Sequence, residues 1–134
     1  MFSALILAIT TAAFVQFGVF YWRALVVCTA AESVSEEVLA AANVEAGTIR
    51  GEDYRAMAQL LRLTPELSAK SFGLGMVPAY FKLMNAIETL AAGKIAAIAN
   101  FAESERGLCA RYAAVQIERR LRANMEFAAS MHSC

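Results

Sequence analysis

An uncharged run at the N-terminus constrains the fold of this chain more than any other feature. The first charged side chain is Arg23, and uncharged residues continue after it to Ala31. As a helix, the 22 residues before Arg23 extend about 33 Å, which exceeds a hydrocarbon core of about 30 Å. The remaining chain, about 100 residues, is too short to bury every side of such a helix in a soluble core. The run therefore predicts a transmembrane anchor over residues 1–31.

The end of this run resembles a membrane interface. Phe20, Tyr21 and Trp22 come immediately before Arg23, and aromatic rings followed by a cation are typical of the headgroup level. No Lys or Arg precedes the run, so the basic residue at its far end favours an outside N-terminus and a cytoplasmic domain over residues 32–134. A cleaved signal peptide is the alternative, because small residues follow Cys28, but the run is long and lacks a basic start.

One side of the predicted span is narrow and partly polar. Ala8, Ala12 and Gln16 are spaced four residues apart, so they lie on one helix face. Small residues allow close contact between membrane helices, and a glutamine amide in hydrocarbon requires a hydrogen-bond partner. This face therefore predicts packing against another transmembrane helix. A lone span with a tolerated glutamine is the alternative.

The composition limits the classes of partner. Hydrophobic residues make up 59% of the chain, above the usual ~45–50%, so we expect surface that a bilayer, another subunit or a second copy covers. The formal net charge is zero, which gives no reason to expect nucleic acid as a partner. The three cysteines, Cys28, Cys109 and Cys134, form no CxxC motif, which favours free thiols over a disulfide framework.

Residues 32–134 predict a small all-α domain behind the single N-terminal transmembrane helix. Ser33 and Glu36 have the spacing of a capping box, so a helix is expected at about 34–45, and apolar residues at three- and four-residue steps predict a second at about 52–63. Two glycines and a proline over 72–78 predict a break. That run matches neither phosphate-binding glycine motif.

The region 79–130 predicts a long or kinked helical segment. A helix-packing face is expected where apolar residues fall within one half of the circumference, and its members are Tyr80, Met84, Ile87, Leu90, Ile95, Ile98 and Phe101. The charges of Lys82, Glu88 and Lys94 point in three directions, which disfavours a second span. The apolar phase slips near Gly107, so we expect either a kink over 104–107 or one helix that meets different neighbours along its length.

Candidates for chemistry are few. The only histidine, His132, lies next to the C-terminus, where no metal site or rigid catalytic pair is expected. Glu103 and Glu105 are two residues apart, on different sides of a helix, so we expect both to be solvated. One basic cluster could contact an anion or a lipid headgroup, with a merely solvated face as the alternative; it comprises Arg119, Arg120 and Arg122.

These features predict a protein without catalytic, metal or cofactor sites. We expect a non-catalytic, single-pass membrane protein that acts as an accessory or scaffold subunit, with the bilayer, other subunits of a membrane complex or further copies of itself as partners. Two alternatives remain open. One is a small pore-forming or membrane-perturbing protein in which residues 72–102 insert, and the other is a small membrane protein that binds a cofactor or lipid.

Overall fold

Helices are the regular structure of the described residues, which are 1–44, 49–66 and 75–133 of the computed structural model. The fold is all-α, as the sequence predicts, and it contains one short 3-10 helix, η1. The elements in chain order are α1 (Phe2–Ala30), α2 (Glu36–Ala41), η1 (Gly51–Asp53), α3 (Tyr54–Leu63), α4 (Met76–Ala91) and α5 (Ala96–His132).

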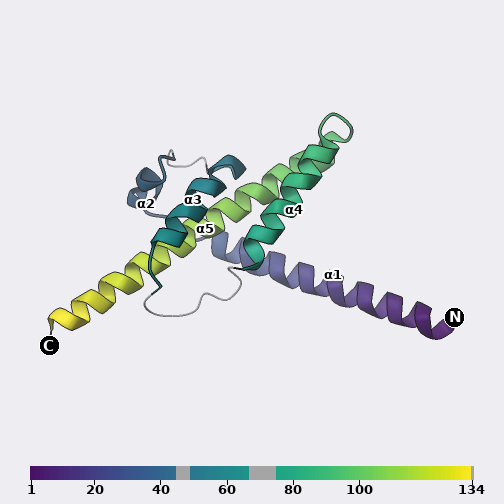
Figure 1. Cartoon of the computed structure of the whole chain (residues 1–134), viewed down its shortest axis with the longest axis horizontal. Helices are drawn as coiled ribbons and strands as arrows, with labels where there is room; N and C mark the ends of the chain where they lie inside the picture. Colours follow the sequence, from purple (N-terminus) through teal and green to yellow (C-terminus); the bar gives the residue numbers. More distant parts are fainter. Residues whose placement is uncertain (45–48, 67–74, 134) are drawn as a thin grey trace.

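Helix α5 is the element on which the others pack (Figure 1). Its middle, between Ala102 and Ile117, is largely buried and rich in alanine, which lets neighbouring helices approach closely. Contacts to it come from α1, α2, η1, α3 and α4. Apolar residues of α3 complete the core: Tyr54, Met57 and Leu61 are all buried. The domain is thus a set of short helices held around one long helix.

Helix α1 projects from this domain (Figure 1). Residues 1–20 are all exposed, and only Val26 and Ala30 of the helix are buried. Among the described residues, α1 is the one helix long and apolar enough to cross a membrane, and none of its most apolar window is buried. After Arg23 the same helix continues to Ala30, and these last two turns pack on α5.

The region 79–130, predicted as a long or kinked helical segment, is divided into two helices near Gly93. Helix α4 ends at Ala91, Gly93 has φ +77°, and α5 begins at Ala96. That φ lies in the left-handed region, which glycine adopts without a steric penalty, so the chain reverses there into a helical hairpin. Around Gly107 the helix is continuous, and the slip in apolar phase reflects different neighbours rather than a kink.

The predicted capping box at the start of the domain is wrong, and the predicted break over 72–78 lies only partly within the described residues. Helix α2 begins after Ser35, not Ser33, and Ser35 makes no side-chain cap bond to its own helix. Of the predicted break 72–78, residues 72–74 lie outside the described residues, while Met76, Val77 and Pro78 form the first turn of α4. Proline is tolerated in a first helical turn, because its missing N–H would have no intrahelical partner there.

Candidate functional site: the junction between α1 and the helical domain

A buried carboxylate joins α1 to the domain. Glu105 of α5 is 1% exposed, and its Oε1 accepts hydrogen bonds from Arg23 Nε at 3.0 Å and from an Arg23 terminal nitrogen at 2.7 Å. Its Oε2 accepts a bond from the Tyr80 hydroxyl at 2.7 Å. Both carboxylate oxygens therefore have partners, and they come from two other helices.

The surroundings of Tyr80 keep its hydroxyl protonated. Burial, and secondly the hydrogen bond to Glu105, raise the pKa of the Tyr80 hydroxyl far above its usual value. Tyr80 therefore remains a proton donor at neutral pH. On the other side, the Arg23 guanidinium lies 5.5 Å from the centre of the Phe101 ring, a distance at which a cation is attracted to the ring face. The junction thus holds one cation between a carboxylate and an aromatic ring.

The expectation that Glu105 is solvated is therefore wrong. An isolated α5 would expose Glu105 to solvent, but α1 and α4 cover that side of the helix. An ionised carboxylate tolerates such burial only when it is paired and hydrogen-bonded. The signal in the sequence was Arg23 itself, a lone cation within an apolar helix that needs a counter-ion.

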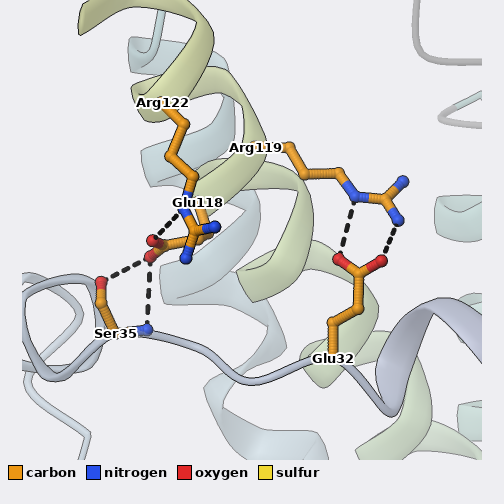
Figure 2. A network of polar contacts seen from close by, with 5 residues as sticks. All are labelled: Glu32, Ser35, Glu118, Arg119 and Arg122. Carbon is orange, nitrogen blue, oxygen red and sulfur yellow. Dashed lines mark hydrogen bonds and ion pairs between the residues drawn. The ribbon is translucent and has the colours of Figure 1, made fainter.

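A second polar network fixes the segment between α1 and α2 (Figure 2). Glu118 Oε2 accepts bonds from the hydroxyl and from the backbone N–H of Ser35, the latter at 3.3 Å, while Oε1 accepts one from Arg122 Nε at 3.0 Å. Close by, Arg119 donates to both oxygens of Glu32. Ser35, the residue before α2, thus uses its hydroxyl for a tertiary contact rather than to cap its own helix.

These contacts shift the titration of both carboxylates. Hydrogen bonding by the Ser35 hydroxyl, supported by Arg122, lowers the pKa of Glu118 despite partial burial. Hydrogen bonding by Arg119 likewise lowers the pKa of Glu32. Both acids are therefore stabilised in the ionised form, and the segment that follows α1 is held to α5 by charge.

The predicted basic cluster is used within the fold. Arg119 and Arg122 bind Glu32 and Glu118, and Arg120 donates to the backbone oxygens of Leu61, at 3.0 Å, and Thr64, at 3.2 Å. Arg120 also lies 3.3 Å from the carboxylate of Glu66. It therefore satisfies carbonyl groups at the C-terminal end of α3, a position that favours a cation.

The residues predicted for the interfacial anchor and for span packing are mostly exposed. In the predicted interfacial anchor, Phe20 and Tyr21 are exposed, whereas Trp22 packs against the core cluster. The face with Ala8, Ala12 and Gln16 is exposed and lines a shallow depression on α1.

The expected helix-packing face is divided by the turn at Gly93. Met84 is buried, Tyr80 and Ile87 are half-buried, and Leu90 is exposed. Ile95, Ile98 and Phe101 are 52%, 41% and 48% exposed, so they do not continue the α4 face as a single helix would.

Other reactive groups are dispersed. Within residues 1–44, 49–66 and 75–133, no group of three or more His, Cys, Asp or Glu side chains could hold a metal ion. His132 is exposed at the end of α5. Cys28 is exposed, and Cys109 is buried, where desolvation raises the pKa of its thiol to about 12. Cys134 lies outside the described residues.

Comparison with known proteins adds no relative. No family model matches the chain, and neither a characterised protein nor a solved structure is significantly similar to it. The junction and the helices around it are therefore the basis for assigning a function.

Proposed function

We propose that this protein is a non-catalytic membrane anchor subunit, an accessory or scaffold component whose α1 crosses the bilayer and whose helical domain lies at the membrane surface. The observation that carries the proposal is the division of α1 into two parts. Residues 1–20 are exposed and apolar, while Val26 and Ala30 are buried against the domain and Arg23 is bonded to Glu105.

This division suits a helix that passes from hydrocarbon into protein. Exposed aliphatic and aromatic side chains on every side of α1 favour lipid over water. Arg23, the first charged residue of the chain, follows directly after the aromatic residues of the predicted interface and is paired there with Glu105. The absence of Lys and Arg before this point favours a cytoplasmic domain with the N-terminus outside.

A partner helix is expected on the narrow face of α1. The depression lined by Ala8, Thr11, Ala12 and Gln16 allows the backbone of a second membrane helix to approach closely, and Gln16 supplies a hydrogen-bonding group. Further copies of this chain or other subunits of a complex fit this description.

A structural role is supported by how the carboxylates are used. Five of them are each bound to an arginine: Glu32, Glu66, Glu88, Glu105 and Glu118. Acids held in this way position helices, whereas a general acid or base must reach a substrate.

Insertion of residues 72–102 as a pore is less well supported. Helix α4 has 16 residues, about 24 Å in length, which is shorter than a hydrocarbon core of about 30 Å. Its Glu88 is bound to Arg106 of α5, so insertion would separate this pair or bury it in lipid at a cost of several kcal/mol.

The test is disulfide crosslinking within the bilayer. In a Cys28→Ser, Cys109→Ala, Cys134→Ser background, Ala12→Cys is expected to crosslink to a neighbouring span in native membranes. Phe14→Cys, which lies about 200° around the helix, is the matched control and should crosslink far less. Equal and negligible crosslinking at both positions, with a monomeric, partner-free particle in mild detergent, would contradict the scaffold role.

A further inference from the structure

A basic groove lies between α3 and α4. It has a volume of about 1050 Å³, slightly above the ~300–1,000 Å³ that is usual for ligand sites. Helix α5 forms its floor through residues that include Arg106, Tyr112 and Arg120. This groove plays no part in the junction with α1 or in the predicted packing of the span.

The charge of the groove differs from that of the chain. Five basic residues line it, Arg55, Arg62, Lys82, Arg106 and Arg120, against two acids, Glu52 and Glu66. The whole chain has a formal net charge of zero. Positive charge is therefore concentrated here, and a concave surface of one sign raises the local concentration of oppositely charged ligands.

Three of the cations remain available. Arg106 is bound to Glu88 and Arg120 to Glu66. By contrast, Arg55, Arg62 and Lys82 are exposed and have no ion pair or hydrogen bond to any residue that the structure describes. The two arginines are seven residues apart on α3, so two helical turns place them on one face, and Lys82 lies across the groove on α4.

The floor of the groove also contains hydrogen-bond donors that have no acceptor in the described part of the protein. The Nε atoms of Arg106 and Arg120 are buried and have no hydrogen-bond partner in the described part of the protein. The acids that bind these two arginines therefore leave part of each guanidinium unsatisfied. Such incomplete pairing maintains positive potential beneath the three exposed cations.

The two aromatic rings that line the groove, Tyr54 and Phe81, are not available to stack on a flat ligand. Tyr54 and Phe81 stack with ring centres 3.9 Å apart, and Arg106 covers the Phe81 ring at 5.3 Å. The Phe81 ring is therefore covered by both neighbours, and Tyr54 is 7% exposed. The pair is closed to a stacking ligand, so charge is what the groove offers.

We propose that this groove binds a ligand through a phosphate group, held by Arg55, Arg62 and Lys82. A phosphate carries up to two negative charges and three acceptor oxygens, which match several cations better than a single carboxylate does. The volume leaves room for the rest of the ligand. The phosphate can belong to a lipid headgroup or to a soluble molecule, and this site is independent of whether α1 spans a membrane.

The test compares two probes on the full-length chain. In neutral detergent, inorganic phosphate is titrated at constant ionic strength by calorimetry; in nanodiscs, retained phosphatidic acid is counted by native mass spectrometry against a phosphatidylcholine background. Saturable binding of inorganic phosphate indicates that the phosphate group suffices, and retention of phosphatidic acid alone indicates a lipid headgroup. Either result supports the site only if it responds to the groove variants.

The double variant Arg62→Gln, Lys82→Gln removes two of the available cations and should weaken binding about tenfold or more, since charge-assisted bonds are the strong ones. Both side chains are exposed, so the melting temperature should be unchanged. Arg111→Gln is the matched control: Arg111 is exposed on α5 and does not line the groove. Failure of both probes to bind saturably, or an equal loss in the Arg111→Gln variant, would overturn the proposal.

Discussion

At the scale of single residues, the fold depends on a few groups whose surroundings leave little choice of side chain. Glu105 is the clearest, because its buried carboxylate accepts bonds from both Arg23 and Tyr80. Removing one partner of a buried charge costs more than the pair contributes, since the remaining charge stays desolvated. Arg23 is 46% exposed, and solvent reduces this cost.

Arg23→Gln should therefore destabilise the protein by about 1–3 kcal/mol, because Glu105 would keep only Tyr80 as a strong partner. Chemical denaturation in detergent micelles measures the change. Arg111→Gln is the control and should alter the free energy of unfolding by less than about 0.5 kcal/mol. If the two variants unfolded at the same denaturant concentration, the junction would not carry the stability assigned to it.

Two glycines predict opposite responses to the same substitution. A Cβ on Gly51 would lie 2.7 Å from the Cβ of Arg106, so Gly51→Ala should force η1 away from α5 and cost about 1–3 kcal/mol. Gly107, inside α5, has its nearest contact at 3.8 Å, to the Ile49 carbonyl oxygen. Gly107→Ala should stabilise by about 0.5–1 kcal/mol, because alanine is the better helix former. Thermal unfolding of both variants checks the signs, and a stabilising Gly51→Ala would refute the close approach.

At the scale of elements, charge pairs hold the segment between α1 and α2 against α5. The bonds from Ser35 and Arg122 lower the pKa of Glu118 in the folded state. An acid with a lowered folded pKa contributes stability that is fully present above its unfolded pKa, about 4.3 for Glu. That contribution is lost as the pH falls through the lower folded value.

Stability should consequently decline as the pH falls from about 5 towards 3, and part of this decline should be missing in Glu118→Gln. Melting temperature against pH measures the effect. Glu126→Gln is the control, because Glu126 is exposed on α5 and has no ion pair in the described chain. A Glu118→Gln variant with the wild-type pH slope would show that the Ser35 contact contributes nothing.

The sequence allowed helices to be predicted more reliably than the residues at which they end or the tertiary contacts that they make. Apolar residues at three- and four-residue steps predicted a helix over about 52–63, where α3 lies, since a 3.6-residue repeat is a local property. The hairpin turn at Gly93 was missed because an isolated glycine in a helical pattern is compatible with continuation. Burial of Glu105 and the contact of Ser35 with Glu118 could not be read from spacing, because their partners lie 82 and 83 residues away along the chain.

At the scale of the whole molecule, two surfaces differ in chemistry. The exposed length of α1 is apolar, and the groove between α3 and α4 is basic. In Figure 1, α1 and the C-terminal part of α5 leave the domain in different directions. A bilayer stabilises an apolar helix attached to a charged domain, because hydrocarbon solvates the helix while water solvates the domain.

Flotation of the full-length chain on a density gradient with phospholipid vesicles, after alkaline extraction, tests membrane insertion of α1 most directly. If α1 inserts into the bilayer, the wild type floats with the vesicles. The double variant Leu7→Arg, Ala12→Arg should not float, since each mid-span arginine opposes insertion by about 2.5–3.5 kcal/mol. A wild-type chain that stays at the bottom of the gradient, monodisperse and soluble without detergent, would contradict the account.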